Sequence, residues 1–347
     1  MTDTPINGDS DMTASAGQKI RYYAMIVVLA GTLFLWLYSS FVGTIVWSIH
    51  LYTGPDPCSF TPHPGVQTIP VLRSEDVDDV PADFVADPFM LCENGRWYMF
   101  FEVLNSATGQ GDIGLATSVD GLQWQYEHIV LDEPFHLSYP YVFKWRESFY
   151  MIPEAQESAS IRLYKATGFP HAWELADTLL TGNFLDPSVV FKDNTWWLFA
   201  LQDNEVLVLY HAPDLSGPWT AHPSNPLVEN DRDIDRPGGR IVMHDGRLIR
   251  YAQDGEPDYG NAVRAFQVDR MSAAEFSQHE IADQPVLEAS GSGWNALGMH
   301  HIDPHRLPDG TWTACVDGKT DKIVFDLRAG AERILRKMKK LLRLQAE

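Results

Sequence analysis

Polar side chains recur at two positions of a repeated pattern along this 347-residue chain. The first position directly precedes a proline, and the second ends an aromatic or apolar run further along the chain. Carboxylates, amides, imidazoles and guanidinium groups can hydrogen-bond adjacent sugar hydroxyls, and two facing carboxyl groups can hydrolyse a glycosidic bond. The residues before proline are Asp87, Tyr139, Asp186, Arg236 and either Asp303 or the nearby His300 and His301. The residues that end the second run are Glu102, Glu154, Gln202, Gln253 and Asp317, and His136, Arg240 and Asp254 lie close to these positions in sequence.

A fivefold repeat must position these residues. Segments 86–102, 138–154, 185–202, 235–253 and 302–317 each contain a polar residue and proline, an apolar run, a turn and a second run. Asn-Gly and Asp-Gly turns between such runs indicate β-hairpins, and this spacing is typical of propeller blades. We therefore predict an all-β fold, a five-bladed β-propeller over 81–327, with a third strand of the last blade at 322–327.

In a propeller, the first strand of each blade begins at the end of the central channel where the second strand finishes. The polar residues should therefore lie around one mouth of the channel. Each one could instead hold a blade turn by bonding backbone amides, and a β-sandwich with unrelated hairpins is the alternative fold.

A long uncharged stretch near the N-terminus predicts a transmembrane helix over 22–49. A secretory signal peptide would have a shorter apolar region. Lys19 and Arg21 precede the stretch, and the next basic residue is Arg73. The positive-inside rule therefore predicts a cytoplasmic tail over 1–21 and an extracytoplasmic propeller, either periplasmic or luminal. Residues 50–80 are rich in Pro, Gly and Asp and are predicted to form a stalk.

The last twenty residues predict a basic amphipathic helix over 328–347. Ile334, Leu335, Met338, Leu341 and Leu342 fall on one helical stripe, and basic residues dominate the rest. This helix could pack against the acidic propeller or lie on an anionic lipid surface.

Composition excludes some classes of function. The net charge of −21 disfavours nucleic-acid binding, which requires clustered basic residues. Three cysteines exclude a disulfide scaffold and match no zinc motif. We predict no metal ligands and the sequence identifies no cofactor, although His300 and His301 could hydrogen-bond or ligate an ion in the channel.

The repeat resembles the propellers of glycoside hydrolase family 43, through Ala-Asp-Pro at 86–88 and Leu-Asp-Pro at 185–187. The resemblance implies that Asp87 is a general base and that Asp186 positions the acid and tunes its pKa. The acid of that family is a blade-four Glu, but Arg236 stands there in this sequence. Glu154 or Glu102 would then have to be the acid, in a different geometry.

A closer resemblance covers about residues 81–320. The strings ADPFM, HLSYPYVF, LDPSVVF, RPGGR and MHHID are similar to the N-terminal domain of glucosamine inositolphosphorylceramide transferase. In the plant enzyme this domain precedes a glycosyltransferase domain. No DxD motif in a Rossmann-like context and no nucleotide-binding glycine loop occur here, so we expect no such domain in this sequence.

The resemblances imply a membrane-anchored propeller that binds or processes a glycan or glycolipid, with inverting hydrolase-like chemistry as one outcome. The alternative is a non-catalytic glycan-binding module that serves cell-envelope polysaccharide or glycolipid assembly.

Overall fold

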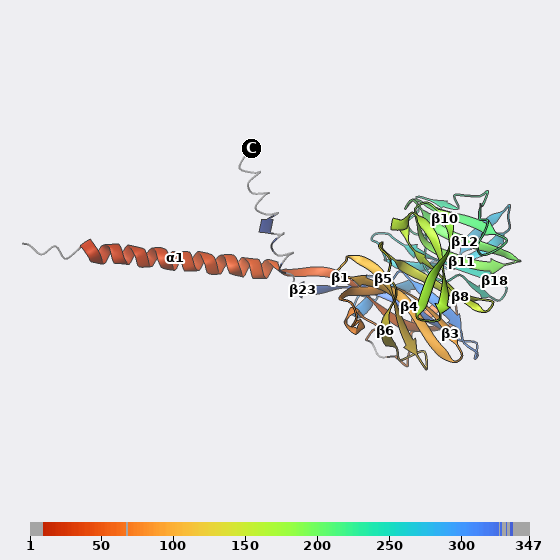
Figure 1. Cartoon of the computed structure of the whole chain (residues 1–347), viewed down its shortest axis with the longest axis horizontal. Coiled ribbons are helices and arrows are strands. Elements are labelled where there is room, and N and C mark those ends of the chain that lie inside the picture. The colour runs from red at the N-terminus through yellow and green to blue at the C-terminus, as the bar shows by residue number, and fades with distance from the viewer. Residues whose placement is uncertain (1–9, 67–68, 326, 328–330, 332–333, 336–347) are drawn as a thin grey trace, which may run out of the picture. The chain divides into compact units, whose positions relative to one another are not determined.

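The computed structural model describes residues 10–66, 69–325, 327, 331, 334 and 335. The chain divides into two compact units. One contains the residues up to Ile45 together with those from Asp321 onward, and the other is Val46–Thr320. The second unit contains the propeller (Figure 1).

Five separate antiparallel sheets form the blades, which confirms the predicted five-bladed β-propeller. The first blade contains β3 (Ala82–Glu93), β4 (Arg96–Asn105), β5 (Gln110–Ser118) and β6 (Gln125–Leu131). The second contains β7 (Ser138–Trp145), β8 (Ser148–Glu154), β9 (Ser160–Gly168) and β10 (Ala172–Thr181). The third contains β11 (Phe184–Lys192), β12 (Thr195–Gln202), β13 (Val206–Ala212), β14 (Thr220–Ala221) and β15 (Val228–Glu229).

The last two blades are less regular. The fourth contains β16 (Arg236–Pro237), β17 (Val242–His244), β18 (Arg247–Asp254), β19 (Ala262–Met271), β20 (Phe276–Glu280) and β21 (Leu287–Glu288). The fifth contains β22 (Ile302–Arg306), β23 (Trp312–Phe325), β1 (Phe41–Asp56) and β2 (Ser59–Pro62). Short 3-10 helices occur at η1 (Ser74–Asp76), η2 (Gln156–Ser158) and η3 (Gly293–Asn295).

Tight turns connect β3 to β4 in the first blade and β17 to β18 in the fourth. Asn94 and Gly95 both have positive φ, as do Asp245 and Gly246. Two positive φ values match the right-handed twist of the flanking strands, and Asn, Asp and Gly tolerate them best.

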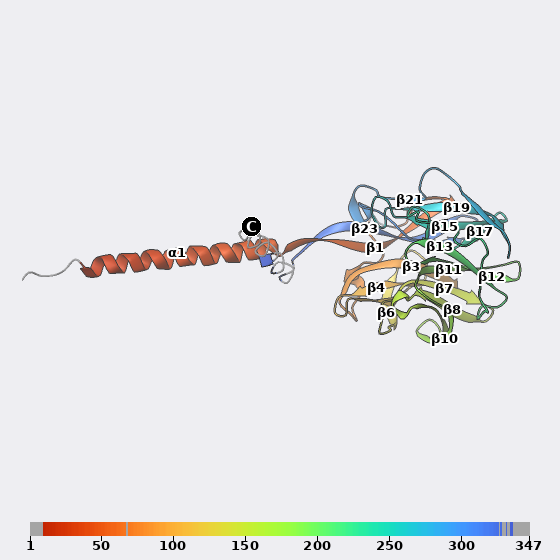
Figure 2. The same cartoon turned by 90° about the horizontal axis from the view of Figure 1, so that it is seen from above.

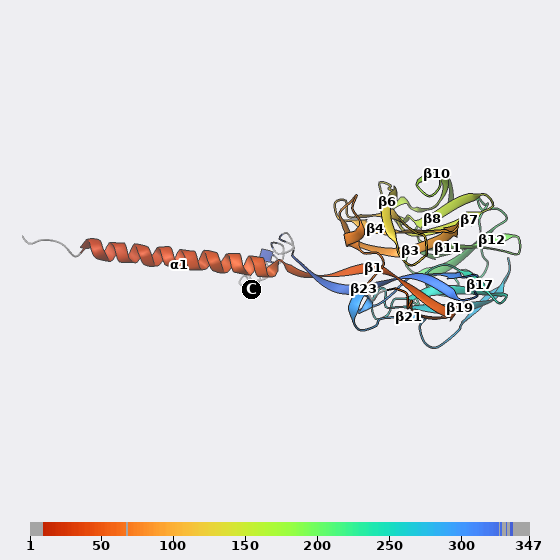
Figure 3. The same cartoon turned by 90° about the horizontal axis from the view of Figure 1, so that it is seen from below.

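The N-terminal strand β1 completes the fifth blade beside the C-terminal strand β23, as Figures 2 and 3 show. Ile49 and Leu51 on β1 are fully buried in the same apolar cluster as Val85 and Phe101 of the first blade. The predicted stalk over 50–80 is therefore wrong in its first part, because residues up to Pro62 belong to the blade. The predicted third strand at 322–327 is also wrong, because Lys322 to Phe325 continue β23 and β1 occupies that place.

The apolar helix α1 spans Ser10–Ser39, and its part from Gln18 to Ser39 is long and apolar enough to cross a membrane. The predicted span over 22–49 is corrected at its C-terminal end, because Phe41 begins a strand. β-Branched and aromatic residues such as Val42, Ile45 and Trp47 favour a strand once a partner is available, and β23 supplies it. The predicted tail helix over 328–347 lies almost entirely outside the described residues.

The closure of the fifth blade predicts different stabilities for two fragments. The fragment 46–320 is expected to melt in one cooperative transition. The fragment 64–320 is expected to lack it, because losing Ile49 and Leu51 alone opens cavities worth about 2–5 kcal/mol each. Circular dichroism during heating measures both. Equal melting temperatures would show that β1 and β2 are dispensable and would restore the stalk.

Candidate functional site

Bulges in three blades direct the residue before proline toward the channel. The strand register shifts at Asp87, Tyr139 and Asp186, each of which precedes a proline. Their φ values are 51°, 45° and 51°. Left-handed backbone at a non-glycine residue is strained, and its occurrence at equivalent positions of three blades indicates that the surrounding fold enforces it.

Asp186 is the centre of one half of the site. Arg236 Nε donates to Asp186 Oδ2 at 2.6 Å, and Arg236 Nη2 donates to Oδ1 at 3.3 Å. Gln253 Nε2 also donates to Oδ2, at 2.6 Å. The same Arg236 Nη2 lies 3.6 Å from Glu154 Oε2, so one guanidinium serves two buried carboxyl groups.

Asp87 lies in the other half with residues from the fifth blade. Asp317 Oδ2 accepts from the Asp87 backbone N at 3.0 Å, and Asp317 Oδ1 is 2.8 Å from His300 Nδ1. His300 Nε2 then lies 3.6 Å from Asp87 Oδ1. We call Asp87, Glu154, Asp186, Arg236, Gln253, His300 and Asp317 the polar cluster.

Burial and neighbouring charges separate the pKa values of Glu154 and Asp186, the two carboxyl groups beside Arg236. Desolvation would raise the pKa of Asp186, but Arg236 outweighs it and holds the pKa below the usual range. Desolvation raises the pKa of Glu154 well above its usual range, and the Asp186 carboxylate raises it further. Two carboxyl groups whose pKa values diverge are suited to different proton-transfer roles.

The pKa values of Asp87 and its two histidine neighbours are also shifted by burial and nearby charges. Desolvation raises the pKa of Asp87 well above its usual range, although the nearby His300 opposes this shift. Desolvation would lower the pKa of His300, but Asp317 and Asp87 raise it overall. His301 is fully buried, and desolvation lowers its pKa to about 4, so it is neutral at pH 7.

Several buried polar atoms of the described residues have no hydrogen-bond partner in this region. They are Asp87 Oδ1, Glu154 Oε2, Gln253 Oε1 and both ring nitrogens of His301. Unpaired buried polar atoms cost free energy, so a cluster of them suggests a place for bound donors.

Three members of the polar cluster could hold a metal ion. Asp87, His300 and Asp317 each offer one ligand atom, and these atoms lie within 4.8 Å of one another. Two carboxylates and an imidazole suit a divalent cation. The sequence predicted no metal ligands, whereas the structure brings three possible ligands together. One of them, His300, already pairs through Nδ1 with Asp317.

Glu102 and His136 form a pair beside the polar cluster. His136 Nε2 lies 3.3 Å from Glu102 Oε1, and His136 Nδ1 accepts from the backbone N of Gly111 at 2.9 Å. Desolvation would lower the pKa of His136, but Glu102 raises it overall. Glu102 in turn raises the pKa of Asp87, which places it within electrostatic reach of the polar cluster.

Four predicted site residues have partners elsewhere. The Tyr139 hydroxyl is buried and bonds Ser188 Oγ and the backbone of Gly239, so it ties blades together. Arg240 pairs with Asp303 and donates to the Val142 carbonyl. Asp254 accepts from Arg264 Nε at 2.8 Å, and Gln202 bonds its neighbour Asp203.

The sequence analysis missed three residues near His300. Trp47 of β1 stacks on the His300 ring, with centroids 4.1 Å apart. Tyr259 approaches the same imidazole edge-on at 5.2 Å, and Lys319 donates to the Tyr259 carbonyl. Tyr259 follows shortly after the strand end at Asp254, which could have placed it at this mouth. Trp47 carried no such signal, because it belonged to the predicted membrane span.

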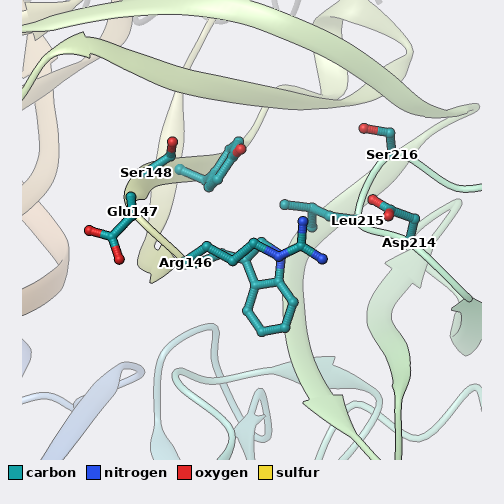
Figure 4. A pocket seen from close by; sticks show the side chains of 8 residues that line it. Arg146, Glu147, Ser148, Asp214, Leu215 and Ser216 are labelled. Atoms are coloured by element: carbon teal, nitrogen blue, oxygen red, sulfur yellow. The ribbon is translucent and has the colours of Figure 1, made fainter.

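A separate surface pocket of about 410 Å³ lies between the second and third blades. Arg146, Glu147 and Ser148 of the β7–β8 turn line one side, and Asp214, Leu215 and Ser216 line the other (Figure 4). It contains no residue of the polar cluster.

The raised pKa values of Glu154 and His136 predict that stability falls as pH rises from about 6.5 to 8, because His301, whose pKa is lowered to about 4, opposes the fall only below about 6.5. A carboxyl group whose pKa is raised by folding stabilises the native state below its unfolded pKa, about 4.3 for Glu154, and this is lost as pH rises through the folded pKa. The raised pKa of His136 acts in the same direction above about 6.5. Calorimetric melting temperatures across this range measure the slope, and Glu154→Gln should flatten it. A melting temperature that rises toward pH 8 would contradict the prediction.

Comparison with known proteins gives a family match. The profile of the family described as "Glucosamine inositolphosphorylceramide transferase 1, N-terminal" matches residues 44–319. Glucosamine inositolphosphorylceramide transferase 1 of Oryza sativa subsp. japonica is 34% identical over 297 residues, which cover 78% of this chain and 40% of the rice protein. The Arabidopsis thaliana protein of that name is 33% identical over 300 residues, covering 78% and 39%. The chain thus spans about 40% of the length of these curated relatives.

Solved structures share the fold at low sequence identity. The catalytic domain of the Coprinopsis cinerea GH62 α-L-arabinofuranosidase gives a TM-score of 0.55 at 14% identity, covering 81% of this chain and 98% of that one. A thermostable family-43 glycoside hydrolase gives a TM-score of 0.51 at 16% identity, covering 71% and 95%. The propeller architecture is therefore shared with glycoside hydrolases.

Proposed function

We propose that the polar cluster binds the sugar part of a glycan or glycolipid. The chain belongs to the family of the N-terminal domain of glucosamine inositolphosphorylceramide transferase 1. The relatives are named glucosamine inositolphosphorylceramide transferases, and one protein that shares the fold is named an α-L-arabinofuranosidase. Both support a saccharide as ligand.

The unpaired buried acceptors are the observation that carries this proposal. Asp87 Oδ1 and Glu154 Oε2 are buried, accept no hydrogen bond and each lie 3.6 Å from a basic side chain, in different blades of the same cluster. A sugar carries several hydroxyl groups on adjacent carbons and can donate to both. Each new hydrogen bond to such an acceptor removes the desolvation cost of leaving it unpaired, about 1–3 kcal/mol.

Glycoside hydrolysis is a second candidate, because Glu154 and Asp186 have divergent pKa values. A protonated Glu154 could donate to a leaving-group oxygen, with the ionised Asp186 beside it and Asp87 as base. Arg236 opposes this role, because its charge favours the ionised form of Glu154. The geometry therefore supports sugar binding more strongly than catalysis.

A glycan array with product analysis tests both candidates. The propeller protein is expected to retain specific oligosaccharides or glycolipid headgroups, and Asp87→Asn should weaken this retention. A wild-type protein that is folded but retains no glycan would reject the proposal. Released monosaccharide or shortened product, detected by mass spectrometry, would establish hydrolysis.

We further propose that α1 anchors the protein in a membrane with its N-terminus in the cytoplasm. The apolar segment Gln18–Ser39 supports a span, and Lys19 and Arg21 at its start support this orientation. A reporter fused after Glu347 should be active only outside the cytoplasm, in the periplasm or lumen. Cytoplasmic activity would reverse the orientation, and a mature protein that lacks α1 would make it a signal sequence.

A further inference from the structure

We propose that Tyr259 is a stacking platform for the apolar face of a pyranose ring at the exposed edge of the polar cluster. This inference rests on the proposed sugar-binding function. Tyr259 would select pyranoses that carry contiguous axial C–H groups on one face of the ring.

Tyr259 combines exposure with direct contact to the polar cluster. The residue is 41% exposed, although it is aromatic. Its ring lies 5.2 Å from the Arg236 guanidinium carbon and 5.2 Å from the His300 ring centroid. An exposed aromatic ring beside buried hydrogen-bonding groups is an amphipathic surface, which suits a ligand with one apolar face and polar edges.

The backbone around Tyr259 is held in place before any ligand binds. Lys319 is 4% exposed, and its ammonium donates to the Tyr259 carbonyl and, at 3.0 Å, to Asp258 Oδ2. Gly260 has a φ of 73°, a conformation that side-chain-bearing residues rarely adopt, and a Cβ there would lie 2.4 Å from Trp47 Cη2. The loop thus packs tightly against β1, and a rigid ring loses little entropy when a ligand binds.

The unpaired acceptors give the platform its orientation. Asp87 Oδ1 and Glu154 Oε2 accept no hydrogen bond, although His300 Nε2 and Arg236 Nη2 respectively lie 3.6 Å from them. Because the Arg236 guanidinium lies over one face of the Tyr259 ring, a pyranose would stack on the other face, with its hydroxyl edge toward the rim of the polar cluster.

The test uses the full chain in detergent micelles and a panel of methyl pyranosides of glucose, galactose, mannose and glucosamine. Saturation-transfer NMR reports which sugar protons contact the protein, and calorimetry gives the Kd. In the wild type, the axial C–H protons of the bound sugar should receive the strongest transfer. Tyr259→Ala and Tyr259→Leu should weaken binding about tenfold or more and abolish this pattern, whereas Tyr259→Phe should stay within about threefold.

Phe191→Leu is the matched control, because Phe191 is an exposed aromatic residue on β11 outside the polar cluster. It should leave Kd and the transfer pattern unchanged. Wild-type binding that Tyr259→Leu leaves intact would overturn the platform while the sugar-binding function stands. A folded wild type that binds no member of the panel and no glycan on the array would overturn both. If Tyr259→Ala fails to fold, Tyr259→Leu and Tyr259→Phe still decide the outcome, because they keep an apolar side chain of similar size.

Discussion

Arg236→Met is expected to lower the free energy of unfolding by about 3–5 kcal/mol, because it leaves a buried carboxylate without its counter-charge. Asp186 is 1% exposed and accepts two hydrogen bonds from this guanidinium. Gln253 and a protonated Glu154 would remain as side-chain donors to it, and neither carries a positive charge. Denaturant unfolding of the 46–320 fragment, followed by fluorescence, measures the loss.

A double variant distinguishes lost charge pairing from lost packing. Asp186→Asn removes the charge and keeps a side chain that tolerates the positive φ at this position. Combined with Arg236→Met, it should recover a large part of the stability, because no unpaired ion remains buried. A double variant that is as unstable as the sum of the single ones would show that Arg236 acts through its packing on Tyr259 instead.

Asp87→Asn is expected to separate a catalytic base from a binding group. A general base must take a proton from water, so its loss should slow glycan cleavage by roughly 10²–10⁴-fold with little change in Kd. A carboxylate that only binds loses a charge-assisted hydrogen bond, about 1.5–3 kcal/mol, and the Kd weakens accordingly. Product release and affinity are measured on the same glycan.

Glu154→Gln is the companion variant for this experiment. If Glu154 is a general acid, the variant should cleave activated aryl glycosides better than natural ones, because a good leaving group needs less protonation. A wild type that binds a glycan but releases no product over days would reject hydrolysis. If Asp87→Asn fails to fold, the Asp87 side chain holds the blade turn through Oδ2, which accepts from the Tyr139 backbone N at 3.3 Å.

The repeat by itself determined the blade number and much of the polar cluster. Antiparallel hairpins of similar length return to the same end of the channel, so Asp87, Glu154, Asp186, Arg236 and Gln253 could be grouped without coordinates. The Asn-Gly and Asp-Gly turns fixed the hairpin register, because few other dipeptides adopt two positive φ values.

Tertiary structure alone decided which neighbouring residue faces the cluster. Gln253 bonds Asp186, whereas the adjacent Asp254 bonds Arg264, because successive strand residues point to opposite faces. Arg240 lies only four residues beyond Arg236, yet it pairs with Asp303 of the fifth blade, whereas Arg236 pairs with Asp186 of the third. Sequence proximity could not show which face of a strand each side chain occupies or which partner it contacts.

The role of residues 41–62 also depended on tertiary structure. An apolar run is equally compatible with lipid and with a buried strand, because both environments exclude water. Pairing with β23, some 270 residues later in the chain, decided that β1 closes the propeller and brings Trp47 against His300. The protonation states of Glu154 and Asp186 also depended on tertiary structure. The sequence shows that both side chains are carboxylic acids, but the position of the Arg236 guanidinium and the burial of both groups separate their pKa values.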